Sequence, residues 1–159
     1  MTPTLPRFSF IPSGESRELA EDIRELFDDL AATLEPDQRA QSGECSPSLD
    51  VFEHDESVEI VVDASGIQPN AIRVLFRAGI VIVAGEKAPT PITPDHTFHL
   101  VEREFGRFPR AVRLAGAFDV PHATAILRDG ELTVLLPKLV ERRDRAHRIE
   151  VTSGDERPE

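Results

Sequence analysis

The chain of 159 residues carries 29 Asp and Glu against 18 Lys and Arg, which gives a net charge of −11, and it has one Cys and no Trp or Tyr. This length suffices for one domain with tails, without help from disulfides or metals. The acidity argues against nucleic acid or an anionic membrane as the main partner, because both present negative surfaces. With a lone Cys45, no apolar run of about 20 residues and no signal-peptide pattern, we expect a soluble cytoplasmic protein.

Charge and hydrophobic pattern divide the chain into three segments: 1–47, 48–138 and 139–159. The first is the acidic one, with ten acids and four bases. Helical spacing over 16–34 predicts an amphipathic helix, capped by Ser13 or Ser16 and ended before Pro36. Its apolar stripe is Leu19, Ile23, Leu26, Phe27, Leu30 and Leu34. The polar stretch 37–47 is interpreted as a linker.

From residue 48 the hydrophobic period changes to two, which is typical of half-buried strands. Strands are predicted at 49–51, 58–64, 72–77, 80–84, 97–104, 108–114, 123–127 and 132–136. The run at 80–84 is continuously apolar, so we expect it to be covered on both faces. Ala78-Gly79 and Asp129-Gly130 are predicted tight turns, and 89–95 is a Pro-rich loop. Seven or eight short strands without a long helix among them predict an all-β, immunoglobulin-like antiparallel sandwich.

The tail after Lys138 is strongly polar except for Ile149 and Val151. In an extended segment these two side chains point the same way. We therefore interpret them as a small apolar plug that adds to a sheet edge or groove of another subunit.

Three stretches of the β segment together resemble the alpha-crystallin domain of the small heat shock (Hsp20) proteins. They are IVIVAGE at 80–86, EREFGRF at 102–108, and AILRDGEL at 125–132 with LPK at 136–138. The tail motif Ile149-Glu150-Val151 is similar to the C-terminal tether of that family. The resemblance implies an N-terminal arm over 1–47, an alpha-crystallin domain over 48–138 and a C-terminal extension over 139–159.

By resemblance, strand 97–104 would be exchanged between subunits and pair with strand 48–53 of the partner. Such an exchange covers edge strands that a monomer leaves exposed. The dimer contact would use Leu49, Val51, Phe98, Leu100, Glu102 and Arg110. For Arg110 an ordinary ion pair on the strand face remains the alternative. The tether would insert into a groove of a neighbouring dimer, whose expected walls are Ile72, Val74, Thr124 and Ile126.

No catalytic, metal or cofactor site is expected. His96 and His99 are an odd step apart and point to opposite faces of a strand, while His54 and His122 lie in turns. Cys45 has no basic or helix-terminal neighbour in the sequence to lower the pKa of its thiol.

The favoured function is an ATP-independent chaperone of the holdase type, a stress-response oligomer that binds partially unfolded proteins and prevents their aggregation. The expected client-binding residues are Phe8, Phe10, Leu19, Ile23, Leu26, Phe27, Leu30 and Leu34. The alternative is a co-chaperone or adaptor module of similar sandwich fold that docks on a larger chaperone. An enzyme is the least favoured class.

Overall fold

The computed structural model describes residues 13–40 and 43–139. Phe8, Phe10 and the tail motif at Ile149 and Val151 lie outside these residues. A single α-helix, α1 (Ser13–Thr33), precedes the strands β1 (Leu49–Glu53), β2 (Ser57–Asp63), β3 (Ile72–Arg77), β4 (Ile80–Lys87), β5 (Gly106–Arg113), β6 (Thr124–Arg128) and β7 (Glu131–Pro137). Short 3₁₀ turns occur at Pro36–Gln38, Pro69–Ala71 and Val120–His122. The predicted helix at 16–34 is confirmed.

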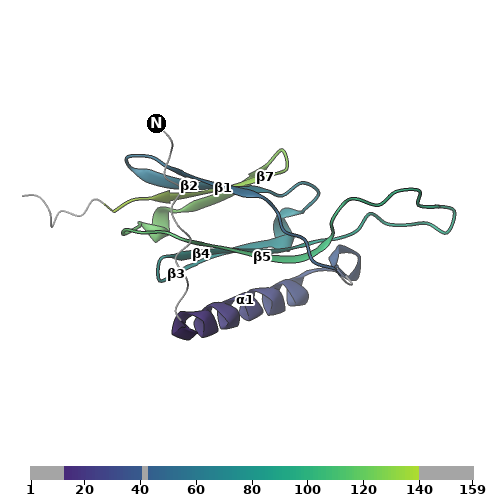
Figure 1. Ribbon diagram of the computed structural model, residues 1–159, viewed down its shortest axis with the longest axis horizontal. Helices are drawn as coiled ribbons and strands as arrows, with labels where there is room; N and C mark the ends of the chain where they lie inside the picture. Colours follow the sequence, from purple (N-terminus) through teal and green to yellow (C-terminus); the bar gives the residue numbers. More distant parts are fainter. Residues whose placement is uncertain (1–12, 41–42, 140–159) are drawn as a thin grey trace, which may run out of the picture.

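The strands form two antiparallel sheets, one of order β1-β2-β7-β6 and one of order β3-β4-β5. The sheets lie face to face in Figure 1, with α1 below the three-stranded sheet. The core between them takes the inward-facing side chain of every second residue, such as Ile60 on β2, Val83 on β4 and Leu136 on β7. The predicted sandwich is confirmed.

Two predicted tight turns join neighbouring strands. Ala78 and Gly79 between β3 and β4, like Asp129 and Gly130 between β6 and β7, all have positive φ angles of 49–82°. Two successive residues with positive φ fit the right-handed twist of the paired strands. Glycine at the second position of each turn avoids the steric cost that a side chain would meet there.

Strand β4 is buried along almost its whole length, as its unbroken apolar sequence predicts. Ile82 pairs with Leu75 of β3 and Ala111 of β5, so these three residues share one face of the sheet. Helix α1 covers this outer face, while Val81 and Val83 on the other face enter the core. A strand between a helix and a second sheet has no face left for water.

The predicted strand at 97–104 is wrong for the single chain. Residues 88–105 form a long arm without strand pairing, and it projects from the end of the sandwich in Figure 1. A strand requires a neighbour for its backbone N–H and C=O groups, and none of the strands in 13–40 and 43–139 pairs with these residues. We refer to residues 88–105 as the arm.

The predicted linker at 37–47 is partly built into the domain. Glu44 forms an isolated bridge with Arg107, and the Cys45 side chain is buried with its thiol donating to the Gly106 carbonyl at 3.4 Å. A Cβ on Gly106 would lie 2.1 Å from the carbonyl oxygen of Gly43. Glycine at 106 therefore permits this backbone approach, which the polar composition of the linker did not reveal.

The described part of the chain contains no helix that is long and apolar enough to cross a membrane.

Candidate interaction surfaces

The apolar stripe of α1 packs on the three-stranded sheet. Leu30 and Leu34, near the end of the helix, are fully buried and belong to the same core as the sandwich. Leu19, Ile23, Leu26 and Phe27, nearer its start, are only half-buried. Burial of a Leu or Ile side chain contributes about 1.5–3 kcal/mol. The helix is therefore held most firmly at its C-terminal end.

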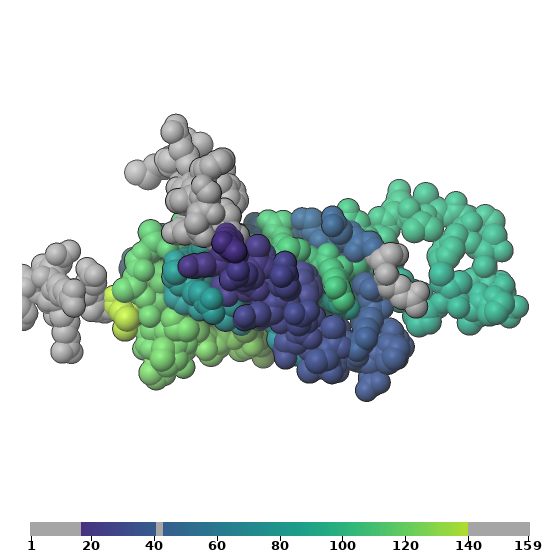
Figure 2. Space-filling view, turned by 90° about the horizontal axis from the view of Figure 1, so that it is seen from below, coloured from purple at the N-terminus to yellow at the C-terminus, as the bar shows by residue number. Residues whose placement is uncertain are grey.

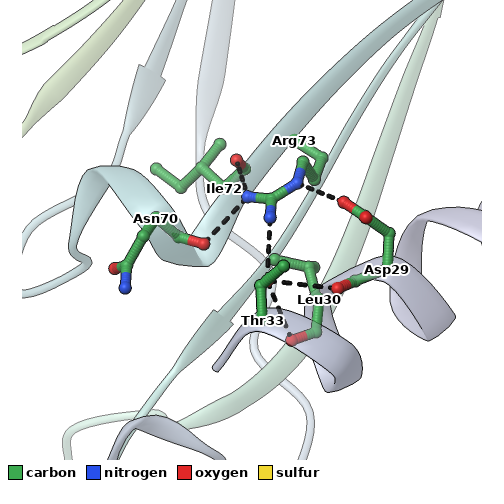
Figure 3. Close-up of polar contacts among 6 residues, drawn as sticks. All are labelled: Asp29, Leu30, Thr33, Asn70, Ile72 and Arg73. Atoms are coloured by element: carbon green, nitrogen blue, oxygen red, sulfur yellow. Dashed lines mark hydrogen bonds and ion pairs between the residues drawn. The ribbon is translucent and has the colours of Figure 1, made fainter. Parts of the chain in front are cut away.

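Arg73 of β3 joins the sheet to the last turns of α1, as Figure 3 shows. Its Nε donates to Oδ2 of Asp29 at 2.5 Å and its Nη2 to the hydroxyl oxygen of Thr33 at 2.9 Å. Its Nη1 donates to the carbonyl oxygens of Asn70 and Ile72 at 2.8 and 3.0 Å. The planar guanidinium group is thus fixed by its own sheet and presented to the helix.

Two further arginines reach α1 from the sheet. Arg77 at the end of β3 pairs with Asp22, Nη1 to Oδ1, at 2.6 Å, and the carboxylate of Asp22 is 95% buried. Arg107 of β5 lies over the ring of Phe27, 5.4 Å from its centroid. Arginines from both edge strands therefore border the apolar centre of this sheet face, and three of them, Arg73, Arg77 and Arg107, contact the helix.

The predicted walls of the tether groove divide between two faces. Ile72 and Val74 of β3 point into the sandwich, where Ile72 belongs to the core and Val74 packs against it. Thr124 and Ile126 of β6 pair with Leu135 and Thr133 of β7, which places both on the outer face of the four-stranded sheet. The four candidate wall residues therefore do not share one face within this chain, and the groove itself stays a prediction.

The inward-facing residues of β6 are Ala125 and Leu127, one step along the strand from the predicted ones. Leu127 packs against the core, but Ala125 remains exposed. An inward-facing yet exposed residue marks the open edge of the sandwich beside β6. The candidate wall residues came from the opposite face of the strand, and a shift of one residue along a strand exchanges the faces.

The arm carries the four most exposed large apolar side chains of the described residues. Ile92, Phe98, Leu100 and Val101 are each 57–73% exposed. Phe98, Leu100 and Phe105 line a shallow cavity of about 320 Å³ with the Pro89 and Ile92 side of the arm. A contiguous exposed apolar surface of this kind marks an interaction site.

Strand β1, the predicted partner of the arm, is an edge strand paired only with β2. Val51 and Phe52 are exposed on it, whereas Leu49 packs against the core. Glu102 is exposed in the arm, and Arg110 on β5 donates from Nη1 to the hydroxyl oxygen of Ser46 at 3.0 Å. Within one chain the arm residues and β1 are not brought together.

Within 17–40 and 43–139, no cluster of three His, Cys, Asp or Glu side chains could hold a metal ion. Burial raises the pKa of the Cys45 thiol, so its neutral form is favoured, which is opposite to the shift an activated thiolate needs. The hydrogen bond between Nδ1 of His122 and Asp119 raises the pKa of that imidazole.

The sequence pattern did not indicate that Arg73 and Arg77 bind the helix. They alternate with apolar residues in β3, which is the pattern of a solvent-facing side. The unbroken apolar run of β4 is the signal that could have indicated this role. Because β4 is covered on both faces, the strand beside it, β3, also has an element packed on each face.

The chain is similar to known proteins in both sequence and structure. The sequence profile of the Hsp20/alpha crystallin family matches residues 50–152. Small heat shock protein C4 of Rickettsia felis is 30% identical over 93 residues, which are 58% of this chain and 57% of that protein. Thus this chain spans little more than half the length of that relative.

Two solved structures are similar to this one. Heat shock protein 16.0 from Schizosaccharomyces pombe is 29% identical, with a TM-score of 0.59, covering 69% of this chain and 100% of the other. A small heat-shock protein from Xylella fastidiosa is 28% identical, with a TM-score of 0.58, covering 69% of this chain and 98% of the other.

Proposed function

The chain belongs to the Hsp20/alpha crystallin family, and from this membership and its exposed apolar arm we propose that it is an ATP-independent holdase of the cytoplasm. It binds partially unfolded proteins and keeps them from aggregating. The observation that carries the proposal is the apolar arm, because a protein working as a monomer gains nothing from exposing Ile92, Phe98, Leu100 and Val101. The acidic surface keeps the complexes soluble.

The building block is a dimer in which each arm pairs with β1 of the partner. Two features support this: among the described residues of its own chain the arm has no strand neighbour, and β1 presents an edge that no described strand pairs with, where Val51 and Phe52 are exposed. Pairing would satisfy the backbone groups of both segments and cover the apolar side chains of the arm. The tail motif at Ile149 and Val151 links dimers into larger oligomers.

Clients bind to the stripe of α1 and to the apolar residues Phe8 and Phe10. Leu30 and Leu34 are part of the core, so they cannot bind a client without loss of the fold. Only the half-buried start of the helix can become exposed and bind one. Leu19 and Ile23 are therefore the residues of the stripe best placed for clients.

The chaperone activity is tested by light scattering from reduced insulin, whose B chain aggregates without heating. The full chain suppresses scattering at equal subunit concentration, with or without ATP. The variant Leu19→Ser/Ile23→Ser is expected to lose at least half of this effect, while Ala20→Ser/Arg24→Ser on the exposed side of the same turns does not. Full scattering with the wild-type chain would overturn the holdase proposal and leave the adaptor module as the better interpretation.

The dimer is tested by native mass spectrometry. Leu100→Asp places a charge in the proposed interface and is expected to shift the population toward monomer at least tenfold. Thr93→Asp, in the same arm but outside the pairing segment, is the matched control. Removal of the residues after Lys138 should leave dimers intact while abolishing larger species. Equal masses for all variants would contradict the assembly.

A further inference from the structure

We propose that the outer face of the β3-β4-β5 sheet is a binding surface for acidic amphipathic helices of client proteins, and that α1 is its intramolecular occupant. The inference rests on the proposed function in taking the partner helix to come from a client protein. Its main test uses a peptide and needs no aggregation assay. The occupant seen in the structure defines the chemistry of the partner.

The centre of this face is apolar and depends on α1 for its cover. Leu75, Ile82 and Ala111 pair across the three strands on the side toward the helix, and Ile82 is 1% exposed. Ile80, at the start of β4, is also buried. Without the helix these side chains would form a contiguous apolar patch on the surface, which seldom occurs without a binding role.

The border of the face is basic. Arg73 and Arg77 on β3 each bind a carboxylate of α1, at 2.5 and 2.6 Å, and Arg107 on β5 covers an aromatic ring of the helix. A helix with an apolar stripe and acids spaced seven residues apart, as Asp22 and Asp29 are, matches both charge and shape. A basic or uncharged helix would leave Arg73 and Arg77 without a carboxylate partner on the helix.

The start of α1 is the weak part of the contact. Leu19 is half-buried, and a recess of about 80 Å³ remains between Glu18, Leu19 and Asp22 of the helix and the Arg77 to Ile82 corner of the sheet. Figure 2 shows α1 lying across this side of the molecule. Because Leu30 and Leu34 hold the other end, the helix can lift from its start while remaining attached, and an incoming helix can take its place.

The probe is a fluorescent peptide of residues 13–35, added to the full-length protein and followed by anisotropy. In the variant Asp22→Arg/Asp29→Arg the resident helix is repelled by Arg77 and Arg73, which remain on the sheet. This variant is expected to bind the wild-type peptide at least tenfold tighter than the wild-type protein does. A peptide carrying the same two substitutions should not bind it.

The reciprocal variant Arg73→Glu/Arg77→Glu provides the matched control, because it should prefer the charge-swapped peptide. Equal binding by all proteins, or no dependence on the peptide's charge, would overturn the proposal. A rise in native mass of Asp22→Arg/Asp29→Arg without peptide binding would assign the face to the α1 of a second copy, and would also overturn it.

If the charge-reversed variants fail to fold, hydrogen exchange on the wild-type protein decides. The amides of 19–26 are expected to exchange faster than those of β4, and excess peptide should speed them at least threefold by displacing the helix. Unchanged exchange would refute displacement.

Failure of insulin protection with intact peptide binding would reject the holdase function alone, whereas protection without peptide binding would reject this surface alone.

Discussion

Glu86 and Arg107 face each other across β4 and β5, and Nε of Arg107 donates to Oε1 of the fully buried Glu86 carboxylate at 2.6 Å. The second carboxylate oxygen accepts the backbone N–H of Ala40 at 3.2 Å. Both residues lie in stretches on which the family resemblance depends, at 80–86 and 102–108. The pair therefore joins the segment after α1 to the centre of the sheet.

Removal of Arg107 leaves a buried carboxylate without its charge partner. We expect Arg107→Met to lower the free energy of unfolding by about 3–5 kcal/mol. Urea denaturation followed by circular dichroism measures this change. Glu86→Gln/Arg107→Met should recover part of the loss, because a neutral amide is less costly to bury. Arg128→Met, at an exposed position on β6, is the control and should change stability little.

Substitution of Leu34 and Leu19 distinguishes the two ends of α1. Leu34→Ala removes a core side chain and is expected to cost about 2–5 kcal/mol. Leu19→Ala removes a half-buried one and should cost less than about 1.5 kcal/mol. Thermal unfolding of the two variants side by side checks the difference. Equal losses would contradict the conclusion that the helix is held mainly at its C-terminal end.

Gly85 makes room for an aromatic ring. A Cβ at this position would lie 2.5 Å from Cζ of Phe108 and 2.9 Å from the carbonyl oxygen of Ala71. Gly85→Ala is therefore expected to lower stability by about 1–3 kcal/mol through overpacking. The double variant Gly85→Ala/Phe108→Leu should lose less than the two single losses combined, since the shorter side chain relieves the clash. Additive losses would show that the ring is not the obstacle.

The Cys45 thiol is expected to react slowly. Burial raises its pKa, so the pH at which alkylation by iodoacetamide reaches half its maximum rate should be higher in the native protein than in urea. The sign for stability follows: the neutral thiol favours the fold below the ordinary pKa, and this contribution disappears as pH rises through the folded-state value. Identical pH profiles in both states would contradict the burial of Cys45.

The pair of His122 and Asp119 is expected to appear in the pH titration of the imidazole by NMR. The hydrogen bond that the Asp119 carboxylate accepts from Nδ1 of His122 raises the pKa of His122. Its stabilising contribution is complete below the ordinary pKa of histidine, about 6.5, and is lost as pH rises through the higher folded-state value. Asp119→Asn should return the titration midpoint of His122 toward 6.5.

The sequence predicted the helix and seven of the strands because these depend on local periodicity and turn residues. It could not predict that 97–104 lacks a strand in one chain, since strand formation there depends on a neighbour outside the local sequence. The outward position of Thr124 and Ile126 was missed for a related reason. Alternation shows that two faces exist, but only the pairing register with β7 shows which face is buried.

The interaction surfaces were predicted in part. The apolar stripe of α1 was visible from its spacing, but its position on the sheet depends on Arg73, Arg77 and Arg107, which are far from it in sequence. Acidic residues on a helix ordinarily face solvent, so the burial of Asp22 had no local signal. Long-range charge pairing of this kind is decided by tertiary structure.

The pairing of β2 with β7 must wait until the ribosome has made the chain between them. The β1-β2 hairpin is complete once residue 63 has been made, but its sheet partner ends at Pro137. At about 5–20 residues per second, translation leaves an interval on the order of ten seconds. During it, Val58, Ile60 and Val62 on the emerging chain lack the β7 residues that lie beside them in the finished sheet. A protein proposed to protect unfolded chains thus itself has unpaired apolar strand residues while it leaves the ribosome.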